Sequence, residues 1–237
     1  MCNFAAYFEN IQFCSDMKKV VFTLGFVLMA AINILAQSPV AALLPMPNSV
    51  DVKEGAKPFS VKKSKLSLFA NGSDLDFAAE TLKGVLAEAF GAEVAVATEA
   101  KKADVVLTTD ATLGNKEHYQ LSVSKKGVKI AGCSPVAVFY AVQTLHQILM
   151  GDARSTLNGE IAAIEIDDAP RYGFRALMLD PARHFLPLQD VKFFIDQMAR
   201  YKYNVLQLHL TDDQGWRIAI ESQAKLASKQ HYTKAEL

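Results

Sequence analysis

Residues 174–210 read FRALMLDPARHFLPLQDVKFFIDQMARYKYNVLQLHL and hold an apolar run, an amphipathic segment and a second apolar run. The runs at 174–179 and 204–210 predict buried strands. Between them, apolar residues recur at i, i+3, i+4, i+7 and i+8 from Val191, which predicts a helix over 188–203. A strand, a helix and a strand at this spacing form a βαβ unit, so we expect the two strands to be parallel.

Two helices are expected upstream of this unit. Ser73 is a candidate cap for a helix with one apolar face, and Gly91 is its expected stop. Ser134 and Pro135 open a second helix that runs to residue 150, because serine caps a helix and proline suits its first position. The segment Asp167-Asp168-Ala169-Pro170 then marks a domain boundary, since proline favours extended backbone before it.

Short strands are expected between and after these helices. They lie at 94–98, 104–108, 119–124 and 128–131, and Lys125-Lys126-Gly127 is the predicted hairpin turn between the last two. Strands combined with two helices predict an α+β domain over residues 37–169, with the helices packed on one face of a sheet.

The N-terminus has the pattern of a secretory signal. Met17-Lys18-Lys19 precedes an apolar run over 20–35 and small residues near Ala36, so residues 1–36 are interpreted as an upstream extension and a signal peptide. A membrane anchor is the alternative, because the run approaches the ~18 apolar residues that a span needs. Asn33 interrupts the run, which favours a signal. We expect an exported protein, periplasmic or extracellular, with no stable membrane anchor.

Composition excludes several classes of partner and cofactor. Lys plus Arg and Asp plus Glu are balanced at 25 each, which gives no reason to expect nucleic acid or an anionic membrane as a partner. Cys133 is the one cysteine after the predicted signal, and there is no Cys/His cluster with the spacing of a zinc site. The cysteine and histidine spacing therefore gives no reason to expect zinc.

Two long strings resemble the opening of the catalytic barrel in glycoside hydrolase family 20. They are residues 174–185, FRALMLDPARHF, and residues 202–218, KYNVLQLHLTDDQGWRI. Upstream, residues 119–123 and 139–148 resemble the small α+β domain that precedes that barrel. The resemblance implies an α+β N-terminal domain followed by the first βα units of a TIM (β/α)8 barrel. A closed barrel needs roughly 200 residues or more, so residues 170–237 are expected to be an incomplete, truncated start of the catalytic domain.

The resemblance implies a substrate-binding role for Arg175. In the family, an arginine at the start of a barrel strand binds hydroxyls of the terminal sugar, and a planar guanidinium can donate to two neighbouring hydroxyls. Ala176 stands where the family commonly has glycine, so the local match is imperfect. The alternative is that Arg175 is held in an ion pair at the start of the strand.

Three further polar residues follow the first predicted barrel strand. Asp180, Arg183 and His184 fall where barrel strands end and face the active site. We interpret Asp180 and Arg183 as an ion pair that supports the loop, and assign no role to His184.

An acidic pair follows the second predicted strand. Asp212 resembles a supporting carboxylate of the family that acts through a histidine on the catalytic glutamate. Asp213 is interpreted only as a residue that supports the loop. In the family the catalytic Asp-Glu pair comes later, so it is expected beyond Leu237 and no catalytic residue is assigned in this chain. Trp216 is interpreted as a packing residue, and His209, within the second strand, as a core histidine with its hydrogen bonds satisfied.

The activity implied by the resemblance is that of a β-N-acetylhexosaminidase. Such an enzyme hydrolyses terminal nonreducing N-acetylglucosamine or N-acetylgalactosamine residues of glycans by substrate-assisted retaining catalysis, an exception to the two-carboxylate scheme. The resemblance implies no metal and no organic cofactor. Without the Asp-Glu pair, the chain alone is expected to be inactive. A noncatalytic carbohydrate-binding or pseudoenzyme role, and a barrel enzyme of unrelated chemistry, are the alternatives.

Overall fold

A computed structural model describes residues 43–61, 65–151 and 159–237. The predicted upstream extension and signal peptide over residues 1–36 lie outside the described residues. Within the described ranges, no helix is both long enough and apolar enough to cross a membrane.

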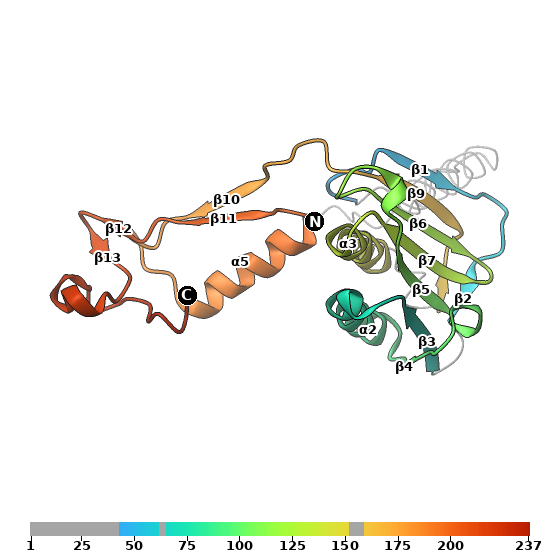
Figure 1. The fold of residues 1–237 in the computed structure, drawn as a ribbon, viewed down its shortest axis with the longest axis horizontal. Helices are drawn as coiled ribbons and strands as arrows, with labels where there is room; N and C mark the ends of the chain where they lie inside the picture. The colour runs from blue at the N-terminus through green and yellow to red at the C-terminus, as the bar shows by residue number, and fades with distance from the viewer. Residues whose placement is uncertain (1–42, 62–64, 152–158) are drawn as a thin grey trace, which may run out of the picture. The chain divides into compact units, whose positions relative to one another are not determined.

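A mixed sheet of seven strands forms the main layer (Figure 1). Its order is β1-β9-β6-β7-β5-β3-β4. β3, β4, β5 and β7 are joined in parallel pairs, whereas β6, β7, β9 and β1 are joined in antiparallel pairs. The strands are β1 (Ser49–Val52), β3 (Lys65–Ala70), β4 (Glu93–Val96), β5 (Val105–Thr109), β6 (Tyr119–Ser124), β7 (Gly127–Gly132) and β9 (Ile164–Asp168). Two short strands, β2 (Phe59–Ser60) and β8 (Glu160–Ile161), form a separate antiparallel pair.

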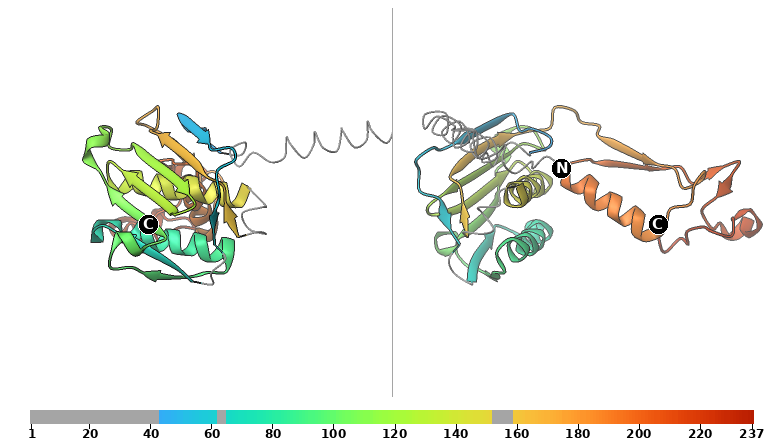
Figure 2. Two further views of the ribbon diagram at one scale, coloured as in Figure 1. Left: turned by 90° about the vertical axis from the view of Figure 1, so that its right-hand side faces the viewer. Right: turned by 180° about the vertical axis from the view of Figure 1, so that it is seen from behind.

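Helices α2 (Asp76–Phe90) and α3 (Pro135–Gly151) lie side by side on one face of this sheet (Figure 2). Alternation along the strands explains which face they cover. On β6, Leu121 and Val123 are buried, whereas Gln120 and Ser124 are exposed on the opposite face. The buried leucines of α2 and α3 complete one continuous apolar core with the inward side chains of the strands. This arrangement is the predicted α+β layer with helices on one sheet face.

The local signals in this layer have mixed outcomes. The predicted cap of α3 is confirmed, because Ser134 Oγ accepts a hydrogen bond from the Ala137 amide at 3.3 Å. Gly91 ends α2 in a left-handed conformation with φ 62°, as expected for a helix stop. The predicted cap at Ser73 is wrong. Ser73 begins a short 3₁₀ turn, η2 (Ser73–Leu75), and α2 starts after it with no side-chain cap.

The predicted hairpin is confirmed, since β6 and β7 pair around Lys125 and Lys126. The strands β1, β3 and β9 were not predicted. Two short 3₁₀ turns, η3 (Ala100–Lys102) and η4 (Ala111–Leu113), flank β5.

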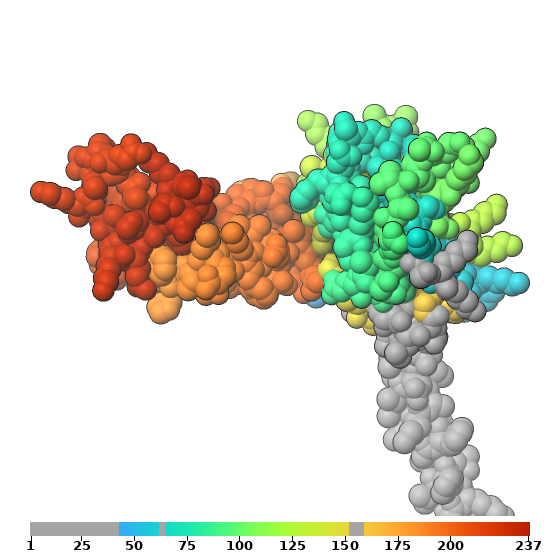
Figure 3. Space-filling model, turned by 90° about the horizontal axis from the view of Figure 1, so that it is seen from below, coloured from blue at the N-terminus to red at the C-terminus, as the bar shows by residue number. Residues whose placement is uncertain are grey.

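The βαβ unit has the predicted topology. β10 (Ala176–Leu179) pairs in parallel with β11 (Val205–Leu208), and α5 (Leu188–Arg200) connects them. Leu179 and Val191 are buried in a small core with Tyr232. The chain continues through the hairpin strands β12 (Thr211–Asp212) and β13 (Gly215–Trp216) to η5 (Glu221–Leu226). The side chains of these later residues form the red surface in Figure 3.

A buried ion pair joins the α+β layer to the βαβ unit. Lys202, after α5, is 3% exposed, and its ammonium lies 3.0 Å from Oδ2 of Asp168 on β9. The same ammonium donates to the Tyr119 hydroxyl at 2.8 Å. Burial lowers the pKa of Lys202, and the neighbouring Asp168 carboxylate opposes that effect. Because both charges are nearly inaccessible to water, each depends on the other as its counter-ion.

Candidate active site

Four polar side chains gather where β10 and β11 end. Asp180 and Arg183 follow β10, whereas His209 and Asp212 follow β11. Because the two strands are parallel and in register from Ala176 to Leu179, their carboxyl ends lie at the same edge. Carboxyl ends of strands carry the active site in barrel enzymes.

Arg183 bridges the two acids of this cluster. Its Nη1 atom lies 2.6 Å from Oδ2 of Asp180, and its Nη2 atom lies 2.9 Å from Oδ2 of Asp212. The Arg183 backbone amide also donates to Oδ1 of Asp180 at 3.1 Å. That amide, together with the guanidinium, lowers the pKa of Asp180. The predicted pairing of Asp180 with Arg183 is therefore present, and Arg183 also pairs with the acid after the second strand.

Asp212 is the most strongly perturbed carboxylate in the cluster. Its Oδ1 accepts from the Asp213 amide at 2.8 Å, and its Oδ2 lies 2.9 Å from Nε2 of His209. The Asp213 amide, His209 and Arg183 lower the pKa of Asp212 to about 2. Asp212 is thus an anion across the physiological pH range, with a histidine and an arginine as its partners.

The other residues predicted around this edge have lesser contacts. Asp213 is exposed, and its amide supports Asp212. His184 is exposed as well. The interpretation of His209 as a core residue is wrong, because its side chain is 30% exposed and bound to Asp212. Trp216 is half-buried, and its indole N–H is buried with no hydrogen-bond partner among the described residues.

Arg175 lies at the opposite end of β10, before the strand begins. Its Nη2 atom donates to Oε1 of Glu117 at 2.7 Å and to the Tyr140 hydroxyl at 2.9 Å. Its Nε atom donates to the Lys202 carbonyl at 2.6 Å, and its side chain is 13% exposed. The hydrogen bond to Glu117 is the main reason that the pKa of Arg175 is raised. These contacts match the alternative interpretation of Arg175, an ion pair at the start of the strand.

Sequence reasoning missed Glu117 and Tyr140, which hold Arg175, and Lys202 with its partner Asp168. Glu117 lies 58 positions before Arg175 in the chain. No local pattern in the sequence predicts a contact between residues that far apart in the chain. The one available signal was Lys202, a charged residue in the last turn of the predicted helix, directly before the apolar residues of the next predicted strand.

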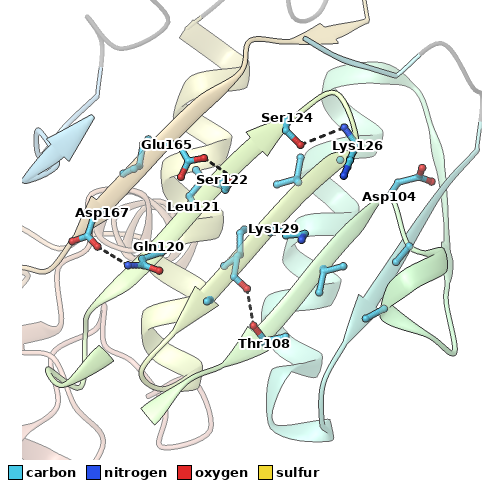
Figure 4. Close-up of a pocket in the computed structure, with 18 of the residues that line it drawn as sticks. Asp104, Thr108, Gln120, Leu121, Ser122, Ser124, Lys126, Lys129, Glu165 and Asp167 are labelled. Atoms are coloured by element: carbon cyan, nitrogen blue, oxygen red, sulfur yellow. Dashed lines mark hydrogen bonds between the residues drawn. The ribbon is translucent and has the colours of Figure 1, made fainter. Parts of the chain in front are cut away.

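A hollow of about 940 Å³ lies over the sheet face that the helices leave uncovered. Figure 4 shows the polar side chains that line it, from β6, β7 and β9 among others. Several are bonded to one another, as Gln120 is to Asp167 at 2.8 Å and Ser122 is to Glu165 at 3.2 Å. The predicted site residues do not line this hollow, so we place the candidate site at the strand ends. Among the described residues, no cluster of His, Cys, Asp and Glu could hold a metal.

Comparison with known proteins identifies relatives of both the α+β layer and the βαβ unit. The family "Glycosyl hydrolase family 20, domain 2" matches residues 40–169, and "Glycosyl hydrolase family 20, catalytic domain" matches residues 172–237. The chain is 38% identical to a beta-hexosaminidase of Vibrio furnissii over 185 residues, which cover 78% of this chain and 29% of that protein. It is 35% identical to a beta-N-acetylhexosaminidase of Cellulomonas fimi, over 83% of this chain and 38% of that protein.

A solved structure supports the same relationship. A mutant Streptomyces plicatus beta-hexosaminidase in complex with its product, GlcNAc, is 33% identical with a TM-score of 0.73. The match covers 84% of this chain and 42% of that one. The chain therefore spans less than half the length of each of these relatives.

Proposed function

The chain belongs to glycosyl hydrolase family 20, and from that membership we propose that the full-length protein is a β-N-acetylhexosaminidase. It removes terminal nonreducing N-acetylglucosamine or N-acetylgalactosamine residues from glycans. The observation that carries the proposal is that both family domains match in order over residues 40–237, with a charged cluster at the strand ends of the second.

The βαβ unit is proposed to open a TIM (β/α)8 barrel. β10 and β11 are parallel neighbours joined by an amphipathic helix, which is the repeating unit of that barrel. In such a barrel, further strands add beside the pair and bring their own carboxyl ends to the same edge. The cluster around Arg183 then forms one side of the substrate site.

Within this site we assign sugar binding to Arg183 in preference to Arg175. Arg183 is at the carboxyl end of β10 and its side chain is 56% exposed, so its guanidinium is accessible to a ligand's hydroxyls. Arg175 is at the amino end, and its guanidinium is already used by Glu117 and Tyr140. The family-based assignment of Arg175 to the terminal sugar thus has less geometric support than an assignment to Arg183.

Asp212 is proposed to support catalysis without touching the reacting bond. An anion held by a histidine can fix that histidine's orientation and raise the pKa of a catalytic glutamate reached through it. The glutamate, and the aspartate that orients the substrate's acetamido group, are expected beyond Leu237. The acetamido oxygen attacks the anomeric carbon, the glutamic acid protonates the leaving oxygen, and the resulting glutamate then activates water.

One pair of substrates tests this proposal. The full-length protein should hydrolyse 4-nitrophenyl N-acetyl-β-glucosaminide and leave 4-nitrophenyl β-glucoside, which has no acetamido group, essentially intact. Comparable rates on both would contradict substrate assistance. Binding of GlcNAc with no turnover of either would favour the noncatalytic carbohydrate-binding alternative.

The 237-residue chain alone is proposed to be inactive, since it would have no general acid. Loss of general acid–base catalysis typically lowers a rate by ~10²–10⁴-fold. Robust turnover of the N-acetylated substrate by the purified chain would contradict this part of the proposal.

We also propose that the protein is exported, which rests on the sequence pattern of residues 17–36.

A further inference from the structure

Arg217 is a buried arginine next to the candidate site, directly after β13. It is 9% exposed, and no carboxylate among the described residues lies within ion-pair distance of it. Its guanidinium instead donates to three backbone carbonyls: Nε to Pro181 at 2.8 Å, Nη2 to Ala182 at 3.0 Å and Nη1 to Gln230 at 3.1 Å. A buried cation held only by carbonyls needs all of these bonds, because a lost bond leaves a desolvated donor.

The backbone of Gly215 lies against the flat face of this guanidinium. A Cβ atom at Gly215 would lie 2.5 Å from Cζ and 2.6 Å from Nη2 of Arg217. Gly215 does not have a positive φ, so the close approach is what requires glycine at this position. The Phe185 ring lies on another side, with its centroid 5.7 Å from Cζ. The guanidinium therefore fills a closely fitted space.

The three carbonyls connect Arg217 to the charged cluster. Pro181 and Ala182 are the two residues between Asp180 and Arg183, so the bonds hold the loop that carries both. The Ala182 amide donates to the His209 carbonyl at 3.1 Å, which fixes the other side of the same peptide.

The main chain of Arg217 is held as firmly as its side chain. Its amide donates to the Leu210 carbonyl at 2.7 Å and closes the base of the hairpin that contains Asp212. Arg217 thus contacts both the loop of Arg183 and the hairpin of Asp212, although it contacts neither side chain directly.

We propose that Arg217 is a positioning residue, which fixes the distance between the Arg183 guanidinium and the Asp212 carboxylate by binding the loop of one to the hairpin of the other. Its role in catalysis rests on the proposed function, whereas its effect on geometry does not. A lysine cannot replace it, because an ammonium lacks the planar fork that reaches three carbonyls in fixed directions.

The first experiment uses the 237-residue chain and needs no activity. The pKa of Asp212 is measured by carbon-detected NMR titration in wild type and in Arg217→Lys, with the exposed Arg171→Lys as the matched control. Release of the Arg183 loop should raise the pKa of Asp212 in Arg217→Lys and leave it unchanged in the control. An unchanged Asp212 pKa in a folded Arg217→Lys variant overturns the proposal.

A second variant covers the case in which Arg217→Lys does not fold. Gly215→Ala adds one methyl group in the space of the guanidinium, and Gly173→Ala is its control, since a Cβ at Gly173 meets nothing within 4 Å. In Gly215→Ala, the amide NMR signals of Ala182 and Arg183 should shift as the loop moves. Shifts confined to the hairpin would contradict the proposal.

The second experiment is a double-mutant cycle in the full-length enzyme. Arg217→Lys should lower kcat/KM by ~10- to 100-fold, since small displacements of a binding group can have effects of that size. In an Arg183→Lys background the same change should lower it by less than about 3-fold, because the group being positioned is already altered. If Arg217→Lys lowered kcat/KM by the same factor in both backgrounds, Arg217 would have a general structural role instead. If wild type is inactive on both substrates, the proposed function fails, and the NMR result still decides the geometric claim.

Discussion

Arg183 Nη2 lies 2.9 Å from Oδ2 of Asp212, so one ion pair links the residues that follow two neighbouring parallel strands. The pair is partly exposed, and Arg183 keeps more than half of its side chain accessible at 56%. A surface ion pair of this kind contributes little to stability. The pair is therefore assigned to the proposed substrate site and not to the interactions that stabilise the fold.

Arg183 and Arg175 should respond differently to substitution in the full-length enzyme. Arg183→Lys should lower kcat/KM by roughly 10- to 150-fold, which corresponds to the ~1.5–3 kcal/mol of a hydrogen bond to a charged group. Arg175→Lys should mainly lower the melting temperature, because it disturbs the contacts with Glu117 and Tyr140. Steady-state kinetics and thermal unfolding of both variants make the comparison. A large kinetic effect at Arg175 with normal stability would restore the family-based assignment.

Asp212 and Asp213 should differ in their pH–rate profiles. Asp212→Asn keeps the shape but removes the charge that is proposed to hold a histidine and raise the pKa of the catalytic glutamate. The basic limb of the kcat profile should move toward lower pH, and the rate should fall. Asp213→Asn should leave the limb in place. The assignment within the pair is wrong if Asp213→Asn moves the limb and Asp212→Asn does not.

The acid stability of the 237-residue chain should have a small component from Asp212, because its partners include the Asp213 amide and His209 as well as Arg183. The folded-state pKa is lowered to about 2, below the ~3.9 of an unperturbed aspartate, so the contribution of Asp212 is present above pH ~4 and is lost as the pH falls toward 2. Melting temperatures of wild type and Asp212→Asn should therefore differ at pH 6 and converge near pH 2. A constant difference across this range would show that the charge of Asp212 is not what the variant loses.

Lys202 should be among the most sensitive positions for folding. Lys202→Met keeps an unbranched side chain but leaves Asp168 as an unpaired buried anion, which typically costs about 3–5 kcal/mol. Urea unfolding of the chain measures the change, with the exposed Lys225→Met as control. Adding Asp168→Asn to Lys202→Met should recover part of the loss, because it removes the stranded charge. A loss of less than ~1 kcal/mol for Lys202→Met would mean that water reaches the pair.

Export should leave a mature protein that begins near Gln37. The pattern of residues 17–36 predicts cleavage there. N-terminal sequencing of the protein recovered from the periplasm or the medium gives the answer. A product that still contains Val21 to Leu35 would favour a membrane anchor.

The parts of the fold that were predictable have local causes. The βαβ unit follows from two apolar runs around a periodic helix, and α3 follows from Ser134 and Pro135 at its start. Strand β1 was missed because it is short and its neighbour in the sheet, β9, lies more than 100 positions away in the chain. Strand β9 was missed because both of its neighbours, β1 and β6, come from distant parts of the chain. Such pairing is decided by the packing of the whole layer and not by the strand's own residues.

The sequence was enough to predict which residues lie at the candidate site, but not how they contact one another. The sequence placed Asp180, Arg183 and Asp212 after strands, which was enough to expect them at one edge. The contact of His209 with Asp212 depends on how the chain turns after β11, and the partner of Arg175 comes from the other layer. Both depend on tertiary contacts that a single sequence does not display.

The buried contact between Lys202 and Asp168 also limits how this protein can recombine with its relatives. Each residue is on a different side of the domain boundary, and neither charge is tolerable alone. Exchange of one domain by gene fusion would therefore succeed only if the incoming domain carried a matching charge at the same place. We therefore expect the residues at these two positions to change together among relatives. For a chimera, this one pair indicates first whether the two domains can be combined.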